Sequence, residues 1–184
     1  YSISQYPILI IVLYDAFKYD YFNTKTVPHL TRLRSLETYA DYLINVFPIK
    51  TFPNHHSIAT GLYPETHGVV GNSYFDTSSK TVVNICPEMF HYNENILPIW
   101  RRNEDMGNGR YTGVMMWPGG YFPYQGKNVT YFKSYDPDFD WYQISIDMIL
   151  EITPTKNNGS VAKTVDVLKS GNGKYSVSSI LVIT

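Results

Sequence analysis

The chain has 184 residues, of which 43% are apolar and 17% charged, and its formal net charge is −1 at pH 7. This length allows one α/β domain with a sizeable core and is short for two, and the composition is globular rather than disordered. No basic run is longer than Arg101-Arg102, which argues against a nucleic-acid duplex as partner, because binding its phosphates needs a concentrated basic face. The longest apolar run, residues 8–14, is too short to span a bilayer, so no membrane span is expected in this segment.

The first third of the chain predicts alternating strands and helices. Residues 7–14 are a continuous run rich in β-branched side chains, which is typical of a strand buried on both faces of a parallel sheet. Leucines at helical spacing predict a helix over residues 27–39, and a second strand is expected over residues 42–48. Pro53 suits the first turn of a short helix that ends at Gly61.

The remaining sequence continues this alternation. The expected elements are strands at 69–75 and 81–85, a helix at 96–103, a strand at 112–117, helices at 139–152 and 160–170, and a strand at 178–184. The pattern predicts an α/β fold with a mostly parallel sheet flanked by helices. Residues 152–175 turn polar and glycine-rich, and the chain then stops on an apolar strand. Ligands of open α/β sheets bind beyond the carboxyl ends of strands, so this chain stops where site residues would be expected. We therefore expect the domain to be incomplete.

Polar residues that could carry chemistry follow the first two predicted strands. Asp15 comes directly after the first strand, and Thr51 comes after the second, just before the predicted helix. A threonine hydroxyl becomes nucleophilic only with a base or a metal, and Asp15 could hold a cation against it. The helix N-terminus could direct its N–H groups at a phosphate, and Asn72 offers an amide donor for a phosphoryl oxygen.

Each of these residues also has a simpler interpretation. A threonine before a helix is usually only an N-cap, and an aspartate at a strand end often forms a turn. Gly71-Asn72 is itself a turn signal. His55 and His56 could be metal ligands, but adjacent helical residues point about 100° apart, which favours a structural role for both.

Two features bear on the cellular compartment. Asn128-Val129-Thr130 and Asn158-Gly159-Ser160 are glycosylation acceptor patterns, which favour a secreted chain. Cys86 is the single cysteine, so it can form no disulfide within this chain. Either its partner lies outside this segment, or it is a small buried apolar residue.

Residues 50–76, KTFPNHHSIATGLYPETHGVVGNSYFD, closely resemble the nucleophile segment of the ectonucleotide pyrophosphatase/phosphodiesterase family. This family belongs to the alkaline phosphatase superfamily of α/β folds. The resemblance extends from about residue 7 to residue 152 and includes Leu97-Pro98-Ile99-Trp100 and Met116-Trp117-Pro118-Gly119. It implies that residues 1–184 are one partial phosphodiesterase catalytic domain, with its nucleophile half at 7–152 and a truncated or spliced remnant at 153–184.

The resemblance also implies roles for individual residues. Thr51 matches the nucleophile that forms a phospho- or nucleotidyl-enzyme intermediate, and Asp15 matches the first zinc ligand. Asn72 matches the asparagine that contacts a non-bridging phosphate oxygen together with the Thr51 N–H. Phe52 and Tyr135 match the aromatic pair between which a nucleobase stacks, whereas without the resemblance both rings would be interpreted as packing.

The sequence departs from the family pattern in two ways. Asp15-Ala16-Phe17-Lys18 stands where the family usually has Asp-Gly-Phe-Arg. The Asp-x-x-Gly-His and Asp-His-Gly segments, which supply most ligands of the family's two zinc ions, are not found, and all five histidines precede residue 92. Asp15 and Thr51 alone give two oxygen ligands, short of the three or four that zinc requires, so at most one zinc would be partly liganded by this chain.

Three functional hypotheses follow. The first is a hydrolase that cleaves phosphodiester or pyrophosphate bonds of nucleotides or other small molecules, with Thr51 as nucleophile and two zinc ions as cofactors. The second is a catalytically inactive fragment or splice product that lacks most metal ligands. The third is a lipid or choline phosphodiesterase of the same family. The resemblance implies an extracellular location, as a secreted protein or as the ectodomain of a membrane-anchored one.

Overall fold

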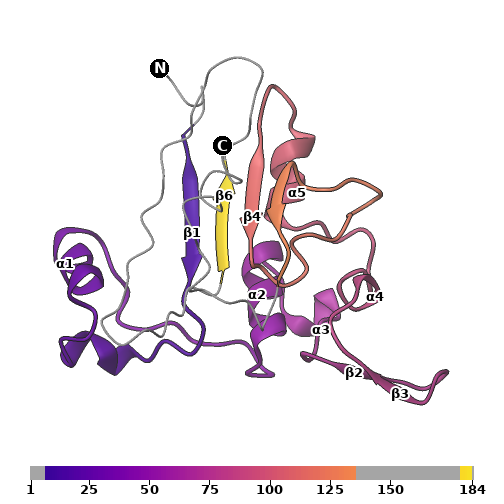
Figure 1. Cartoon of the computed structure of the whole chain (residues 1–184), viewed down its shortest axis with the longest axis horizontal. Helices are drawn as coiled ribbons and strands as arrows, with labels where there is room; N and C mark the ends of the chain where they lie inside the picture. Colours follow the sequence, from indigo (N-terminus) through magenta and orange to yellow (C-terminus); the bar gives the residue numbers. More distant parts are fainter. Residues whose placement is uncertain (1–6, 136–178, 184) are drawn as a thin grey trace.

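The computed structural model describes residues 7–135 and 179–183. Its main sheet has the strand order β1-β6-β4-β5 (Figure 1), formed by β1 (Leu9–Leu13), β6 (Ser179–Ile183), β4 (Thr112–Met115) and β5 (Tyr131–Lys133). β4 and β5 are parallel. β6 lies between β1 and β4 and runs antiparallel to both, with Leu181 opposite Ile11 on one side and Val114 on the other.

β1, β4 and β5 therefore share one direction, as the sequence predicts, and β6 runs in the opposite direction. The position of β6 in the chain was predicted, but its direction was not. A run rich in isoleucine and valine predicts a strand but does not fix its direction. The expected burial of residues 7–14 on both faces is wrong, since Leu9 and Ile10 of β1 are 47% and 51% exposed. β1 packs mainly beside β6, and among the described helices none makes comparable contact with it.

Helices and one hairpin connect the strands. The helices are η1 (Tyr19–Asn23), α1 (Pro28–Leu36), α2 (Thr51–Thr60), α3 (Pro64–His67), α4 (Pro87–Phe90) and α5 (Ile99–Asp105), and the hairpin is formed by β2 (Tyr74–Asp76) and β3 (Thr81–Val83). In Figure 1, α2 lies beyond the carboxyl end of β1, and α1 lies on the far side of β1 from the rest of the sheet. None of the helices within the described ranges is long and apolar enough to cross a membrane.

Most predicted elements are confirmed with shifted ends. α1, α2, α5 and β4 overlap the ranges predicted for them, and the two short strands at 69–85 correspond to the β2–β3 hairpin. α2 ends as expected at Gly61, whose backbone is left-handed with φ of 72°, a conformation that glycine adopts without steric cost. The helices predicted at 139–152 and 160–170 lie outside the described residues.

The strand predicted over residues 42–48 is wrong. This segment is not a strand, and its apolar side chains face outward, with Leu43 76% and Phe47 85% exposed. A strand needs a neighbour to satisfy its backbone, and within the described ranges none of the paired strands lies against it. A short apolar run was therefore insufficient to define a strand here.

The core lies between α2, α5 and the end of β4. Trp100 and Trp117 are almost fully buried, with ring centroids 6.1 Å apart. Phe90 joins them to α2 through its contact with Phe52 at 6.0 Å. Large aromatic rings bury much apolar area per residue, so this cluster holds α2 in place.

Two buried histidines, His56 of α2 and His67 of α3, pack against each other beside this core. His67 Nδ1 accepts a hydrogen bond from the Val69 N–H at 3.1 Å, so its Nε2 carries the proton and donates to Ser57 Oγ at 2.9 Å. His56 is fully buried, and neither of its ring nitrogens has a hydrogen-bond partner within the part of the chain that the structure describes. Burial, followed by the nearby His67 and His91, lowers the pKa of His56 to about 3.

Mild acid should therefore destabilise the fold. A histidine whose pKa is about 3 when folded and 6.5 when unfolded contributes its full stability above pH 6.5. That contribution falls as the pH drops toward 3, because only the unfolded chain takes up the proton. The loss is about 1.4 kcal/mol per pH unit for one such group. We expect the thermal midpoint to fall steadily between pH 6.5 and 5 at constant ionic strength. A variant of the exposed His29, His29→Gln, should keep this slope, and a flat profile would contradict the prediction.

Replacing His56 with phenylalanine should stabilise the chain. The variant removes two buried nitrogens without partners, each of which costs about 1–3 kcal/mol, and keeps a ring against Phe90 and His67, which contact it at 5.3 and 4.8 Å. The thermal midpoint should rise at pH 7.5, and the pH slope should become smaller. His67→Phe is the matched control, since it leaves Ser57 Oγ and the Val69 N–H without this partner and should lower the midpoint. A lower midpoint with an unchanged slope in His56→Phe would refute this account.

Candidate functional site

The structure brings Asp15 and Thr51 together. Asp15 lies on the loop after β1, and Thr51 is the first residue of α2, next to Lys50 with extended backbone at the N-cap. Thr51 Oγ1 faces Asp15 Oδ2 at 3.5 Å. Thr51 is therefore not the N-cap of the helix, and its hydroxyl faces the carboxylate that ends the first strand.

The loop that carries Asp15 is strained. Ala16 has a left-handed backbone with φ of 54°, which costs an L-residue about 1–2 kcal/mol. This is the position at which the resembling family usually has glycine, which adopts this conformation freely. The Ala16 N–H donates to Asp15 Oδ1 at 3.1 Å, so the strained backbone helps to fix the orientation of the carboxylate.

Asn72 reaches the first turn of α2 from the turn before β2. The Phe52 N–H donates to Asn72 Oδ1 at 2.9 Å. Because a backbone N–H can only donate, the oxygen of the side-chain amide must face Phe52. The Asn72 –NH₂ group is therefore not used in this bond.

Phe52 and Tyr135 also meet, in a geometry that leaves no gap between them. Their ring centroids are 5.6 Å apart with an interplanar angle of 88°, an edge-to-face contact. Phe52 is only 5% exposed. Burial, and then the charge of Asp15, raises the pKa of Tyr135, so this ring lies over the same group of residues. A base could enter between the rings only after Tyr135 turned away.

Two residues that the sequence analysis did not assign to the site also hold its first turn. His55 Nδ1 donates to the Thr51 carbonyl oxygen at 2.8 Å, and its ring packs edge-on against Trp117. Burial lowers the pKa of His55, although the Thr51 carbonyl and Asp15 oppose this shift. Asn54 bonds to the segment before Thr51. An asparagine inside a short helix is unfavourable, and this is the feature of the sequence that could have indicated a special role for Asn54.

The described residues do not form a complete metal centre. No group of three or more histidine, cysteine, aspartate or glutamate side chains lies close enough together within residues 7–135 and 179–183 to hold a metal ion. Asp15 and Thr51 are thus the ligand candidates that the described part of the chain brings together. Cys86 is half-buried and not in a disulfide.

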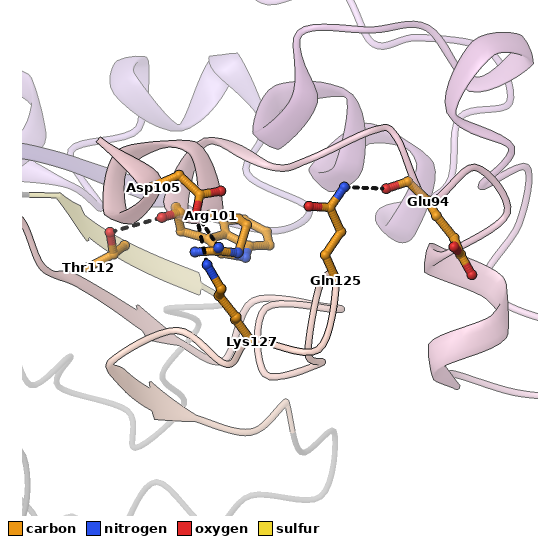
Figure 2. A network of polar contacts seen from close by, with 7 residues as sticks. Glu94, Arg101, Asp105, Thr112, Gln125 and Lys127 are labelled. Carbon is orange, nitrogen blue, oxygen red and sulfur yellow. Dashed lines mark hydrogen bonds and ion pairs between the residues drawn. The ribbon is translucent and has the colours of Figure 1, made fainter. Parts of the chain in front are cut away.

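Asn128, the first residue of one acceptor pattern, is exposed on a well-braced loop. Figure 2 shows the polar network that ties this loop to α5: Arg101 pairs with Asp105, which also lies 3.5 Å from Lys127 Nζ. Gln125 Nε2 donates to the Glu94 carbonyl oxygen at 3.2 Å. The second acceptor, Asn158, lies outside the described residues.

Comparisons with known proteins agree with this arrangement. The family described as type I phosphodiesterase / nucleotide pyrophosphatase matches residues 9–168. Bis(5'-adenosyl)-triphosphatase ENPP4 of Bos taurus is 38% identical over 138 residues, 74% of this chain and 30% of that protein. An uncharacterized pyrophosphatase/phosphodiesterase of Schizosaccharomyces pombe is 37% identical over 141 residues, 74% of this chain and 28% of that protein.

Solved structures give the same result. Murine ectonucleotide pyrophosphatase / phosphodiesterase 5 matches with a TM-score of 0.58 and 28% identity, over 74% of this chain and 36% of that one. An inactive threonine-to-alanine variant of the murine protein, in complex with AMP, matches with a TM-score of 0.58 and 27% identity, over 75% of this chain and 36% of that one. The chain spans about a third of the length of these relatives.

The alkaline phosphatase-like α/β class predicted from the sequence is therefore confirmed, with the described residues forming a partial version of that fold. The family match covers most of the chain, including every residue placed around α2. This chain belongs to the type I phosphodiesterase / nucleotide pyrophosphatase family.

Proposed function

We propose that this chain carries the nucleophile part of a hydrolase that cleaves phosphodiester or pyrophosphate bonds of nucleotides, with Thr51 as the nucleophile. The observation that carries the proposal is the meeting of the Thr51 hydroxyl with Asp15, 3.5 Å away, at the start of α2. The names of the relatives support the reaction class. The murine relative that is inactive as a threonine-to-alanine variant, and is seen with AMP, supports both the nucleophile and a nucleotide substrate.

In this mechanism Thr51 Oγ1 attacks the phosphorus atom in line with the leaving group. As the oxygen–phosphorus bond to Thr51 forms, the hydroxyl gives up its proton to water, the bond to the leaving alcohol or nucleotide breaks, and the leaving oxygen takes up a proton. Water then attacks the phosphorus, the bond to Thr51 breaks, and the Thr51 oxygen regains a proton as the phosphorylated product leaves. Asp15 holds the hydroxyl in position before attack. Asn72 Nδ2 donates to a non-bridging oxygen, whose charge grows in the transition state, and the positive end of the α2 dipole acts in the same sense.

Two zinc ions are part of this proposal through the family resemblance, and the described residues fit them only in part. Zinc needs three or four protein ligands, and the described ranges bring together Asp15 and Thr51 without a third ligand group. If the natural chain lacks the remaining ligands, the alternative of an inactive fragment holds. The incomplete ligand set is the specific observation that favours it.

The substrate and location are proposed on similar grounds. Phe52 and Tyr135 are two aromatic rings that contact each other beside the proposed nucleophile. Once Tyr135 moved, the base of a nucleotide would stack between them. A small nucleotide or another phosphodiester is therefore the proposed partner. The exposed Asn128 on its braced loop and the ectonucleotide relatives support an extracellular, glycosylated protein.

Removing the nucleophile tests the proposal directly. Thr51→Ala should reduce kcat for a chromogenic nitrophenyl nucleotide ester by roughly 10³-fold or more, because the loss of a nucleophile removes the covalent route. Assays with added zinc and after chelation would show whether turnover depends on the metal. Thr60→Ala at the other end of α2 removes a comparable hydroxyl, which bonds to the His56 carbonyl, and should retain activity. Turnover that survives Thr51→Ala would overturn the assignment, and no turnover in the folded wild-type chain would favour the inactive fragment.

Asn72→Ala should lower kcat more than it changes KM. It removes a donor aimed at charge that develops in the transition state, and such losses reach about 10²–10³-fold. Asn84→Ala, at another exposed asparagine, is the matched control and should behave as wild type. Equal effects of the two variants on kcat would mean that Asn72 acts only as a turn residue.

A further inference from the structure

One side chain, Asn54, makes several hydrogen bonds to the segment that leads into Thr51. Residues 46–50 lead into α2 without being part of a strand, and Phe47 and Ile49 along it are 85% and 71% exposed. These two side chains therefore do little to fix the segment. Apart from the bond from the Lys50 N–H to the Pro48 carbonyl oxygen, the hydrogen bonds of its backbone within the described residues converge on Asn54, which lies one turn into the helix and is half-buried.

The Asn54 amide bonds to this backbone at several points. Its Oδ1 accepts from the Val46 N–H at 2.9 Å, and its Nδ2 donates to the Lys50 carbonyl oxygen at 2.9 Å. The carbonyl oxygens of Pro48 and Val46 lie at 3.4 and 3.5 Å from the same nitrogen. The orientation of the amide is fixed, because only the oxygen can face an N–H and only the –NH₂ can face carbonyl groups.

This pattern replaces a missing strand partner. Bonding both the N–H and the carbonyl group of one residue is what the peptide of a neighbouring strand does in a sheet, and Asn54 does this for Val46. At the other end of the segment, Lys50 O accepts from Asn54 Nδ2 and from the Asn54 N–H at 3.3 Å. Lys50 is the N-cap of α2 and makes no capping bond with its own side chain. Asn54 therefore holds both ends of the segment against the first turn.

We infer that Asn54 is a positioning residue for the nucleophile: it clamps residues 46–50 so that Thr51 starts the helix with its hydroxyl facing Asp15. The inference rests on the proposed function of Thr51. A shift of about 1 Å in a reacting group can cost 10²-fold in rate. Because Thr51 follows Lys50 directly, loss of the clamp moves the attacking oxygen without touching the substrate.

The test compares three variants of the full chain. Asn54→Ala should lower kcat about 100-fold with little change in KM. The Val46 amide should exchange with solvent about 10-fold faster, because its own hydrogen bond to Asn54 is lost. The Phe52 amide should also exchange faster, because a displaced first turn weakens its hydrogen bond to Asn72. Asn54→Asp keeps the acceptor for the Val46 N–H and loses the donors to the carbonyl groups. It should lower kcat similarly while exchange at Val46 stays near wild type. Ala59→Gly weakens the same helix far from the clamp and should lower the thermal midpoint without changing kcat.

Two results would overturn the inference. One is an Asn54→Ala variant with wild-type kcat and wild-type exchange at Phe52, and the other is an Ala59→Gly variant that loses as much kcat at a similar thermal midpoint. If the wild-type chain shows no turnover, the proposed function fails separately. The amide exchange rate at Phe52 then tests the positioning by Asn54 independently of activity, and an unchanged exchange rate in Asn54→Ala would reject it.

Discussion

The first turn of α2 has no side-chain cap at Lys50, and Asn72, from outside the helix, accepts from the Phe52 N–H. Two side chains of α2 itself, His55 and Asn54, donate to the carbonyl oxygens of Thr51 and Lys50. A helix N-terminus without a cap leaves donors free for a ligand. The same feature that makes this turn suitable for binding a phosphate therefore leaves its position to be fixed by these three side chains.

Those side chains can act only because the core beneath α2 is rigid. His55 packs on Trp117, and Phe52 and His56 both pack on Phe90. The face of α2 that binds the core carries imidazoles as well as apolar rings, and burial lowers the pKa of both helix histidines. Stability of the site is thereby linked to proton concentration through groups that take no part in the proposed chemistry.

Much of this arrangement could be predicted from the sequence. The apolar run of β1, Gly61 at the end of α2 and the family-like segment at 50–76 identified the strand end, the helix and the residues that meet there. The direction of β6 and the absence of a strand at 42–48 could not be predicted, because both depend on which segments pair. The clamp of Asn54 was missed for the same reason: its partners are backbone groups, and side-chain patterns do not report where backbone groups are satisfied.

The sequence also could not show whether the site is open. Phe52 and Tyr135 were expected to flank a base, and their identity says nothing about whether the rings contact each other when no base is present. Only the coordinates of both side chains reveal the edge-to-face pair.

That pair has a consequence for affinity. An edge-to-face aromatic contact is worth about 0.5–1.5 kcal/mol, and a base that enters must first break it. The contact between the two rings therefore excludes the base. The apparent dissociation constant for a base rises in inverse proportion to the fraction of molecules whose rings are apart. By the relation between free energy and equilibrium constant, this contact weakens base binding by roughly 2- to 13-fold. Substrates without a base that bind elsewhere on the site avoid this penalty, so the closed pair narrows the preference for nucleotides that the two rings would otherwise create.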